Sequence, residues 1–588
     1  MTALFFALRL LAAALSFGGY GWFLHRRFEL RAEFLPVTVF ASASCALFLA
    51  GILNMLAAAV WILFFGGLIL LAVELLRRRP TKAELRELLP FGVVLFAVGC
   101  AWAILFLRDA HLYAYDDFSH WGAIVKELQR NNQLPSFASQ IVTFPDYPPG
   151  SALFVYYVTK LLGPGENRML MAQLILTLSC VVTPFAFAGR GRRAVLPCLA
   201  ATAGGLLMLA CFPQALSTLL VDSLLPLMAL ANTAVLLFYR DRMRTACLLS
   251  IPLMAMTILI KNSGMFFVGL NLLLLLGLAV RCRRKRQLPG RQILRYSLIG
   301  LLLPLCLLVV WKQHVRLVFP EEELRGHHTV SVENYAQNYT EKTPEQLAQI
   351  RAQFLERATD FGVRYNHFML LMTEAAAVLY LVFRLLLKRR LTWLLLSTIA
   401  ADAAYLLYLL GIYLTYLFSM PAAEASSLEA FRRYALTMVI YAIGVVLIGA
   451  LIDTERLWGY VGTVRWGGAG AAVLPGTILL VFCYCMLLIK GWEPFLSRPA
   501  YETTRPYPLD RALEQVVDAR PGDSYLIYLP GSDRDAKYSW YLVRYKLFGE
   551  EFELASSFES RTELEEKRAE YNHFVIVKED EALSQLIR

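Results

Sequence analysis

The chain has 588 residues, of which 57% are hydrophobic and 18% charged, and its mean hydropathy is +0.51. This composition excludes an ordinary soluble globular protein and indicates a polytopic membrane protein. The formal net charge is +11, but the basic residues stand in clusters at the ends of apolar runs, which argues against nucleic-acid binding.

Apolar runs recur along the chain from the first residues to Ile489. Because a bilayer core needs about 20 apolar residues per helix, these runs predict about fourteen transmembrane helices. The first run is followed by arginines and is predicted to be a retained helix rather than a signal peptide. The predicted spans are 4–24, 35–52, 55–76, 90–107, 168–188, 194–212, 218–238, 244–260, 263–280, 293–311, 366–387, 391–417, 434–452 and 468–489.

Basic clusters predict the orientation of these helices. HRRFELR follows Leu24, RRRPTK follows Leu76 and RCRRKR follows Val280, and the positive-inside rule places such clusters in the cytoplasm. Both termini are then outside, provided that the short segment 151–163 does not cross the membrane fully. We therefore expect a transmembrane domain over 1–490, with outer loops 108–150 and 312–365 and a shorter outer segment, 419–433.

The tail from Gly491 alternates helix and strand signals. RALEQVVDARPGDSYLIYLP predicts a helix, a Pro-Gly turn and a strand, and the alternation continues to HFVIV. No GxGxxG or P-loop is present, so a nucleotide site is not predicted. Residues 491–588 are predicted to form a small extracytoplasmic α/β domain.

The stretch YDDFSHWGAIVKEL sets Asp116 and Asp117 directly after an apolar run. Aspartates favour the first turn of a helix, and an N-cap role would account for one of them. Two adjacent carboxylates tend to give one a raised pKa, which suits a general base or a metal ligand. Charge is costly near a bilayer, so the pair favours a functional role.

Further acidic and basic residues lie near the predicted outer ends of spans. In FPDYPPGSALF, Asp146 precedes two prolines that favour a helix start, although a plain loop end would also explain it. Asp222 and Lys261 either form an ion pair with each other or belong to a site. Glu374 either snorkels or pairs locally.

In LEAFRRYAL, arginines open a span from the outer side, where the positive-inside rule does not expect them. Guanidinium groups bind phosphate bidentately, so an anionic ligand at the outer leaflet is one explanation. An interfacial arginine and tyrosine anchor is the other. In the second outer loop, His327 and His328 are either metal ligands or solvated side chains, and solvation is favoured.

In order and placement, these motifs resemble the GT-C superfamily of integral-membrane glycosyltransferases. That superfamily includes protein O-mannosyltransferases, oligosaccharyltransferases and the aminoarabinose transferases of lipid A. YDDFSH resembles the acidic motif of its first outer loop, and PDYPPG resembles its later acidic residue before a helix start. LIKNSG resembles its basic residue at a span's outer end, and the Arg-Tyr pair 433–434 resembles one implicated in binding a lipid-linked phosphate. No WWD-type acceptor motif stands in the tail, so a peptide-sequon acceptor is not indicated.

The resemblance implies an inverting glycosyltransferase at the outer face of the membrane. It would move a sugar from a polyprenyl-phosphate-linked donor to a cell-envelope glycan, lipid or protein acceptor. Asp116 would be the catalytic base and Asp117 its acidic neighbour, and Asp116 and Asp146 are also candidate ligands of a divalent metal ion. The predicted substrate-binding residues are Tyr115, His120, Trp121, Asp146, Tyr147, Asp222, Lys261, Asn262, Arg432, Arg433 and Tyr434.

The alternative from another class is a non-catalytic flippase or transporter of a lipid-linked envelope precursor. Asp222, Lys261 and Glu374 would then line its pathway. Transporters are often built from inverted repeats with broken midplane helices, and no such pairing is visible in the sequence. The predicted location is the cell membrane of a bacterium, and the expected partners are the lipid-linked donor, membrane lipid and the acceptor.

Overall fold

The computed structural model describes residues 3–189, 194–320, 332–386, 388, 390–461, 491, 493–516, 520–531 and 536–588. The helices of the first half are α1 Ala3–Phe28, α2 Leu35–Ile52, α3 Leu56–Arg77, α4 Lys82–Leu88, α5 Phe91–Phe106, α6 Gly122–Asn131, α7 Gly150–Leu162, α8 Glu166–Val181, α9 Val195–Cys211, α10 Leu224–Phe238, α11 Met243–Ile260 and α12 Gly264–Arg284. Those of the second half are α13 Gly290–Val318, α15 Val332–Thr340, α16 Pro344–Thr359, α17 Arg364–Leu386, α18 Thr392–Phe418, α19 Ala422–Ser426, α20 Phe431–Val461, α22 Glu493–Leu496, α23 Pro506–Leu513, α24 Ala536–Leu547, α25 Arg561–Glu570 and α26 Glu581–Ile587.

Shorter elements complete this description. The 3-10 helices are η1 Ala32–Phe34, η3 Thr183–Phe187, η5 Pro213–Leu216 and η6 Tyr501–Thr503, and η2 Asp117–Trp121 is a π-helix. The strands are β1 Tyr525–Tyr528, β2 Phe552–Ala555 and β3 His573–Ile576.

Ten helices of the described residues are long and apolar enough to cross a bilayer: α1, α2 with η1, α3, α8 with η3, α11, α12, α13, α17, α18 and α20. Each coincides with a predicted span. The pair α4 and α5, bent by 60°, is an eleventh candidate at the predicted span 90–107. The predicted span 468–489 lies outside the described residues. The protein is therefore a polytopic α-helical membrane protein, as the composition predicts.

The other two predicted spans are shorter than expected. α9 has 17 residues and α10 has 15, which gives lengths of about 26 and 23 Å. The prediction that a helix begins at residue 218 is wrong, because the chain turns through η5 and an irregular segment and becomes helical only at Leu224. Asp222 therefore lies in a turn before α10 rather than inside a helix. The short segment 151–163 forms α7, which has 13 residues and is buried among other helices.

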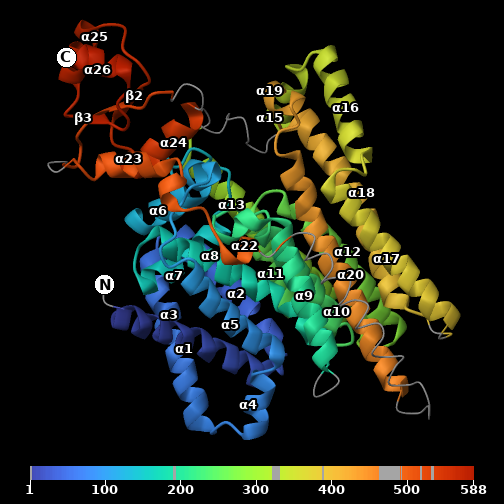
Figure 1. Cartoon of the computed structure of the whole chain (residues 1–588). Helices are drawn as coiled ribbons and strands as arrows, with labels where there is room; N and C mark the ends of the chain where they lie inside the picture. The colour runs from blue at the N-terminus through green and yellow to red at the C-terminus, as the bar shows by residue number, and fades with distance from the viewer. Residues whose placement is uncertain are drawn as a thin grey trace.

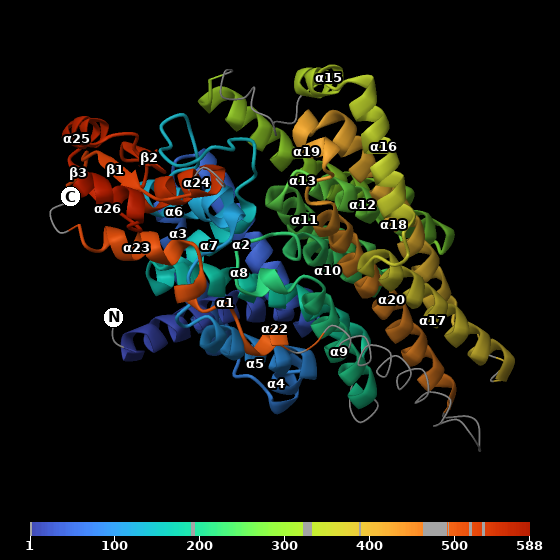
Figure 2. The same ribbon diagram turned by 45° about the horizontal axis from the view of Figure 1, so that its top comes forward.

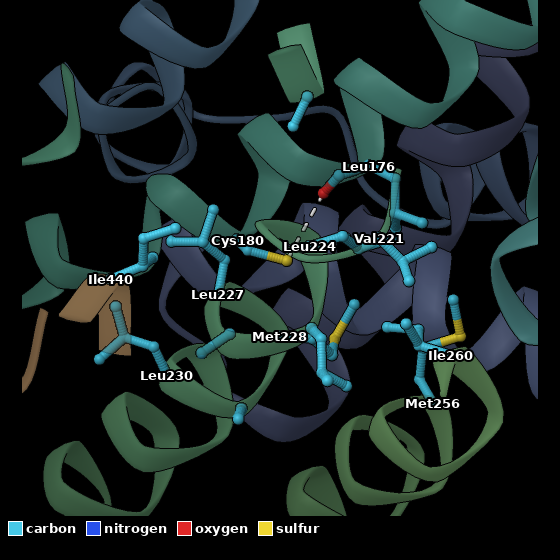
Figure 3. Packing of buried hydrophobic residues seen from close by; sticks show 14 of the residues in the cluster. Leu176, Cys180, Val221, Leu224, Leu227, Met228, Leu230, Met256, Ile260 and Ile440 are labelled. Atoms are coloured by element: carbon cyan, nitrogen blue, oxygen red, sulfur yellow. Dashed lines mark hydrogen bonds between the residues drawn. The ribbon is translucent and has the colours of Figure 1, made fainter. Parts of the chain in front are cut away.

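Membrane helices pack through interlocking apolar side chains and close backbone approaches, since lipid gives them no hydrophobic drive to associate. Figure 3 shows one such region, where residues of α8, α10, α11 and α20 meet, with Met228, Met256 and Ile440 among them. Where α1 crosses α3, a Cβ added at Gly19 would lie 2.0 Å from the carbonyl oxygen of Gly67. Only small residues allow that approach.

The C-terminal residues form a small α/β unit with a three-stranded parallel sheet in the order β2-β1-β3. Tyr525 of the central strand pairs with Phe552 on one side and His573 on the other. All four residues of β1 are buried, as expected for a parallel strand with neighbours on both sides. The unit lies at one end of the helical bundle, with α24 beside α6, and α4 lies at the other end (Figures 1 and 2). The predicted alternation of helix and strand is confirmed, and the domain boundary at residue 491 stays a prediction.

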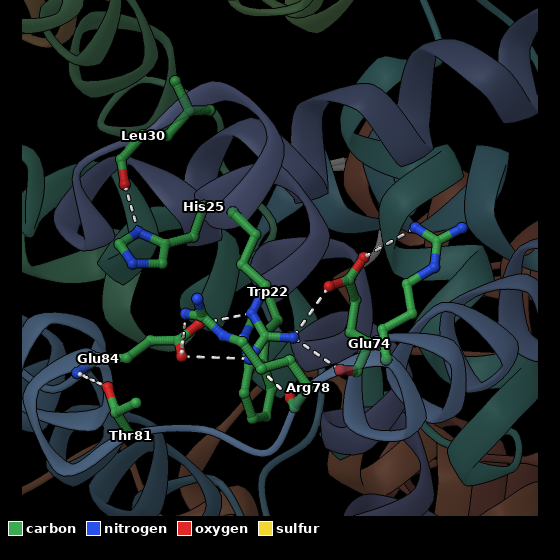
Figure 4. A network of polar contacts seen from close by, with 9 residues as sticks. Trp22, His25, Leu30, Glu74, Arg78, Thr81 and Glu84 are labelled. Atoms are coloured by element: carbon green, nitrogen blue, oxygen red, sulfur yellow. Dashed lines mark hydrogen bonds and ion pairs between the residues drawn. The ribbon is translucent and has the colours of Figure 1, made fainter.

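A polar network holds α4 against α1 and α3 at the end away from the sheet (Figure 4). Arg26 of α1 forms ion pairs with Glu84 at 2.5 Å and Glu74 at 3.0 Å. The N-cap residue of α4, Thr81, accepts a hydrogen bond from the backbone N–H of Glu84 at 3.2 Å. Buried carboxylates are tolerated when they are paired in this way.

Candidate functional site

The loop between α5 and α6 is fixed by Asp117, which is fully buried. Its Oδ2 accepts hydrogen bonds from the backbone N–H groups of Tyr113 and Ala114 at 3.4 and 3.1 Å. Its Oδ1 accepts one from the N–H of Leu219 at 2.8 Å, which joins the loop to the irregular segment before α10. Neither Asp116 nor Asp117 makes a side-chain N-cap hydrogen bond to the helical residues that follow it, and the backbone N–H groups that Asp117 accepts near the start of this helical stretch are those of preceding residues.

Asp116 points away from these backbone groups and toward the first turn of α20. Its Oδ2 accepts a hydrogen bond from Nη1 of Arg433 at 2.6 Å, and Nε2 of His120 lies 3.9 Å from the same oxygen. The Asp116 side chain is 12% exposed and that of Arg433 is 26% exposed. The structure thus brings together two predicted residues that are 317 positions apart in the sequence.

The two aspartates differ in electrostatic environment. Burial raises the pKa of Asp117 to about 7, although its three backbone N–H partners act in the opposite direction. Burial also acts to raise the pKa of Asp116, but the charges of His120, when protonated, and of Arg433 and Lys261 outweigh it and lower that pKa. Burial lowers the pKa of His120 to about 4. At neutral pH, Asp116 is therefore ionised and His120 is neutral.

A second carboxylate and a second cation extend the contact between Asp116 and Arg433. Oδ1 of Asp222 accepts a hydrogen bond from Nζ of Lys261 at 3.3 Å, and its Oδ2 lies 3.4 Å from Nε of Arg433. That Oδ2 and that Nε are buried and make no hydrogen bond among the described residues. Nζ of Lys261 also lies 5.4 Å from the ring centroid of Tyr434. The two carboxylates balance the two cations, so an anionic ligand would compete with the carboxylates for both.

Asp146 belongs to a neighbouring polar group that also includes a predicted residue, Asn262. Oδ1 of Asp146 pairs with Nζ of Lys312 at 2.5 Å, and its Oδ2 accepts a hydrogen bond from Nδ2 of Asn262 at 3.2 Å. The indole N–H of Trp311 donates to the backbone carbonyl of Asp146 at 3.3 Å. Lys312 was not among the predicted site residues. It ends an apolar run just as Lys261 does, so the same criterion would have found it.

The predicted aromatic residues fall into two groups. The ring of Tyr147 stacks on His120 with centroids 4.8 Å apart, and the buried Trp121 lies edge-on to Tyr147 at 5.4 Å. Tyr115 turns the other way and contacts the ring of Tyr541 on α24 at 5.5 Å. The rings of Tyr147 and Trp121 pack beside His120, near Asp116, whereas the ring of Tyr115 faces the C-terminal unit.

Some predicted residues do not join this cluster. Arg432 is exposed on α20, one position before Arg433, and Glu374 is exposed on α17. His327 and His328 lie outside the described residues.

The donor set does not fit a divalent metal ion at the two predicted ligands. Asp116 is paired with Arg433, and Asp146 is paired with Lys312 and Asn262. Within the described part of the chain, no group of three or more His, Cys, Asp or Glu side chains could hold a metal ion.

The C-terminal unit packs against the loop that carries Asp116 and holds it in place. Oη of Tyr538 donates a hydrogen bond to the backbone carbonyl of Tyr113 at 3.0 Å, and Nζ of Lys126 donates to the carbonyl of Tyr545 at 2.5 Å. The ring of Phe118 lies 5.2 Å from that of Tyr545. These contacts lie on both sides of Asp116 in the sequence, so α24 fixes the loop from its N- and C-terminal sides.

The ion pairs of Lys546 add to the contacts between the C-terminal unit and the loop. Nζ of Lys546, whose side chain is 12% exposed, pairs with Glu166 of α8 and Asp510 of α23, both at 2.9 Å. Glu166 in turn accepts a hydrogen bond from the backbone N–H of Leu112 at 3.0 Å. Lys546 therefore links the C-terminal unit, α8 and the start of the loop.

Replacement of Lys546 by methionine is expected to lower the thermal unfolding temperature of the detergent-solubilised protein. Breaking a buried ion pair by removing one partner costs about 3–5 kcal/mol, because the remaining carboxylates lose their counter-charge. Lys578→Met, which removes an exposed lysine from the same unit, should leave the unfolding temperature unchanged. Equal unfolding temperatures for the two variants would contradict the linking role of Lys546.

The fold and the buried charges together define the class of this protein. It is a polytopic α-helical membrane protein with a small C-terminal α/β unit, and a charge-paired polar cluster lies where its helices end beneath that unit. No protein-family model and no curated protein sequence matches the chain. Among solved structures, that of ArnT from Cupriavidus metallidurans in the apo state is similar, with 15% sequence identity and a TM-score of 0.40. That similarity covers 79% of this chain and 85% of that chain.

Proposed function

We propose that this protein is a glycosyltransferase that moves a sugar from a polyprenyl-phosphate-linked donor to a cell-envelope acceptor at the outer face of the membrane. The observation that supports this most directly is the 2.6 Å contact between the Asp116 carboxylate and Arg433, with Lys261 beside it. A general base and two phosphate-binding cations then meet where membrane helices end. This is what transfer from a membrane-bound phosphate ester to a hydroxyl requires.

In the proposed reaction, Asp116 takes the proton of an acceptor hydroxyl. The acceptor oxygen forms a bond to the anomeric carbon of the donor sugar, while the bond from that carbon to the phosphate oxygen breaks. The electron pair leaves with polyprenyl phosphate, and the configuration at the anomeric carbon inverts. The proton remains on Asp116 until it passes to solvent.

Arg433, Lys261 and Tyr434 would stabilise the negative charge that develops on the leaving phosphate. In the resting protein, Arg433 is held by Asp116 and lies close to Asp222. Donor phosphate would compete for this guanidinium and draw it from Asp116. Because Arg433 helps to lower the pKa of Asp116, its departure would make the carboxylate a stronger base when the donor is bound.

The remaining predicted residues receive supporting roles in this proposal. Asp117, whose oxygens accept backbone N–H groups, would hold the loop and so aim Asp116. Asp146 and Asn262, together with Lys312, would orient the acceptor or the donor sugar beside the base. His120, Trp121 and Tyr147 would form the wall behind Asp116. Arg432, which is exposed, receives no role.

The proposed orientation rests on the basic helix ends. The last turn of α1 holds His25, Arg26 and Arg27, and Arg281 in the last turn of α12 pairs with Asp241. Arg26 and Asp241 line a common cavity together with Ala83 and Glu84 of α4, and α4 lies at the end of the protein away from the C-terminal sheet (Figures 1 and 2). The positive-inside rule assigns that end to the cytoplasm, so Asp116 and the C-terminal unit would be extracytoplasmic.

Purified protein in proteoliposomes tests this proposal when it is supplied with a panel of polyprenyl-phosphate pentoses, hexoses and aminosugars, together with cell-envelope glycans, lipids and proteins as acceptors. We expect release of free polyprenyl phosphate from at least one donor, detected by mass spectrometry. A non-catalytic flippase would instead move donor across the bilayer with the glycosyl phosphate bond intact. Translocation without release would overturn the glycosyltransferase assignment.

A further inference from the structure

Helix α24 presents two different faces. One face packs on the loop and the sheet and includes the buried Tyr538, Leu542 and Tyr545. The other face is formed by Lys537, Trp540, Tyr541 and Arg544, at positions i, i+3, i+4 and i+7 of one helical stripe. Trp540 is 39% exposed, and Tyr541 is half-buried. This second face of α24 therefore combines two aromatic rings with two basic side chains.

The rings on this face continue to the loop that carries the proposed catalytic base. Trp540 and Tyr541 lie with centroids 5.1 Å apart, and Tyr541 and Tyr115 lie 5.5 Å apart. Tyr115 is 36% exposed and is the residue immediately before Asp116. Two segments more than 400 residues apart in the chain, the loop and α24, thus contribute rings to one surface.

The ring of Trp540 is held in its orientation by Arg544. The guanidinium of Arg544 lies 4.8 Å from the centroid of the Trp540 ring, and the same guanidinium donates hydrogen bonds to the backbone carbonyl of Gln140 at 3.0 and 2.7 Å. A cation held over one face of an indole ring restrains the ring plane. Trp540 is therefore supported by the loop itself, through Arg544 and Gln140.

The chemistry of this surface fits a saccharide ring. Tryptophan and tyrosine offer a flat apolar face and a polar edge, which match the C–H face of a pyranose and its peripheral hydroxyls. An acyl chain would instead be matched by aliphatic side chains, but Leu542 and Val543 of this helix are buried on the opposite side. Sites for small polar ligands commonly combine aromatic walls with a few polar groups in this way.

We propose that Trp540, Tyr541 and Tyr115 form an acceptor subsite that binds a saccharide ring beside the loop that carries Asp116. This inference rests on the proposed function and narrows it, because the acceptor is then a glycan or a glycolipid and not an unmodified protein. The C-terminal unit would have two tasks, since one face of α24 holds the catalytic loop and the other binds the acceptor.

The test measures saccharide binding without any donor, so that its result does not depend on transfer. Detergent-solubilised full-length protein is applied to an array of neutral and acidic oligosaccharides. We expect binding to a subset of them, and Trp540→Ala should weaken that binding by about tenfold, the scale of a lost aromatic contact. Trp540→Phe, which keeps a ring, should retain most of the binding.

The matched control is Trp61→Ala, which removes a tryptophan of similar exposure, 49%, from the membrane helix α3. It should bind the array as the wild type does, and thermal unfolding should confirm that all variants fold. Absence of saccharide binding by the wild type, or equal binding by Trp540→Ala, would overturn the subsite. It would also be overturned if Trp540→Ala weakened only the association of the protein with lipid vesicles, since Trp540 would then be a membrane anchor. None of these results bears on donor release, which tests the proposed function separately.

Discussion

The Asp116→Asn variant is expected to fold normally and to lose about 10²- to 10⁴-fold in the rate of sugar transfer, the range that a general base contributes. Asparagine has nearly the same shape and its amide oxygen can accept the hydrogen bond from Arg433, but it cannot take the proton of an acceptor hydroxyl. The measurement is the release of polyprenyl phosphate in proteoliposomes, with thermal unfolding of the same preparation to show that the fold is intact.

Asp109→Asn is the matched control for this variant. Asp109 belongs to the same loop as Asp116, but its side chain is 72% exposed and its partner is the exposed Arg108. An exposed ion pair contributes little, so this variant should transfer sugar at the wild-type rate. Wild-type turnover in Asp116→Asn would remove Asp116 from the reaction, whatever the effect of the control.

The membrane helices could be predicted from the sequence because length and apolarity alone decide whether a segment can cross a bilayer. The same criterion could not show where the chain unwinds. Residues 218–223 are apolar enough to read as the start of a helix, yet they are not helical, and they bring the N–H of Leu219 to Asp117 and the carboxylate of Asp222 to Lys261. Pro213 and the polar residues Gln214, Ser217 and Thr218 are local signals of that break.

The residue types of the candidate site could also be predicted, and the ion pair between Asp222 and Lys261 was one of two predicted alternatives, but the direct contact of Asp116 with Arg433 could not be predicted. The sequence places Asp116 and Asp117 side by side and gives no means to tell which one faces α20. That choice depends on the π-helix at Asp117–Trp121 and on backbone N–H groups from two distant segments. It explains why Asp117 is better suited to hold the loop than to act as a second catalytic carboxylate.

The contacts between the C-terminal unit and the loop could not be predicted from the sequence either. The helices and strands of this unit follow from local signals, but the contacts of Lys546 with Glu166 and of Tyr538 with Tyr113 join residues hundreds of positions apart. Such contacts depend on how α24 docks on the loop, and hydrophobic periodicity does not encode that docking. The order β2-β1-β3 is likewise a tertiary feature.

The Arg433→Gln variant is expected to lower kcat/KM for the donor by about 10²- to 10³-fold, the usual effect of removing one donor that stabilises a developing oxyanion. It should also move the acidic limb of the pH profile of kcat/KM to higher pH. Activity needs the Asp116 carboxylate and is lost as the pH falls through its pKa. Without Arg433, burial is less strongly opposed, so that pKa rises and the loss begins at a higher pH.

Arg432→Gln removes the neighbouring arginine, which is exposed and outside the cluster, and should change neither the rate nor the pH profile. Arg433→Lys keeps a positive charge near Asp116 and Asp222 but loses the bidentate geometry of a guanidinium. It should therefore leave the acidic limb near its wild-type position while still weakening donor use. A difference between the pH profile and donor use in this variant separates the two roles of Arg433. Its effect on the pKa of Asp116 depends on charge alone, whereas its binding of phosphate depends on the shape of the guanidinium. If the acidic limb of Arg433→Gln stayed at the wild-type pH, Arg433 would not tune the base, and the coupling between donor binding and activation of Asp116 would fail.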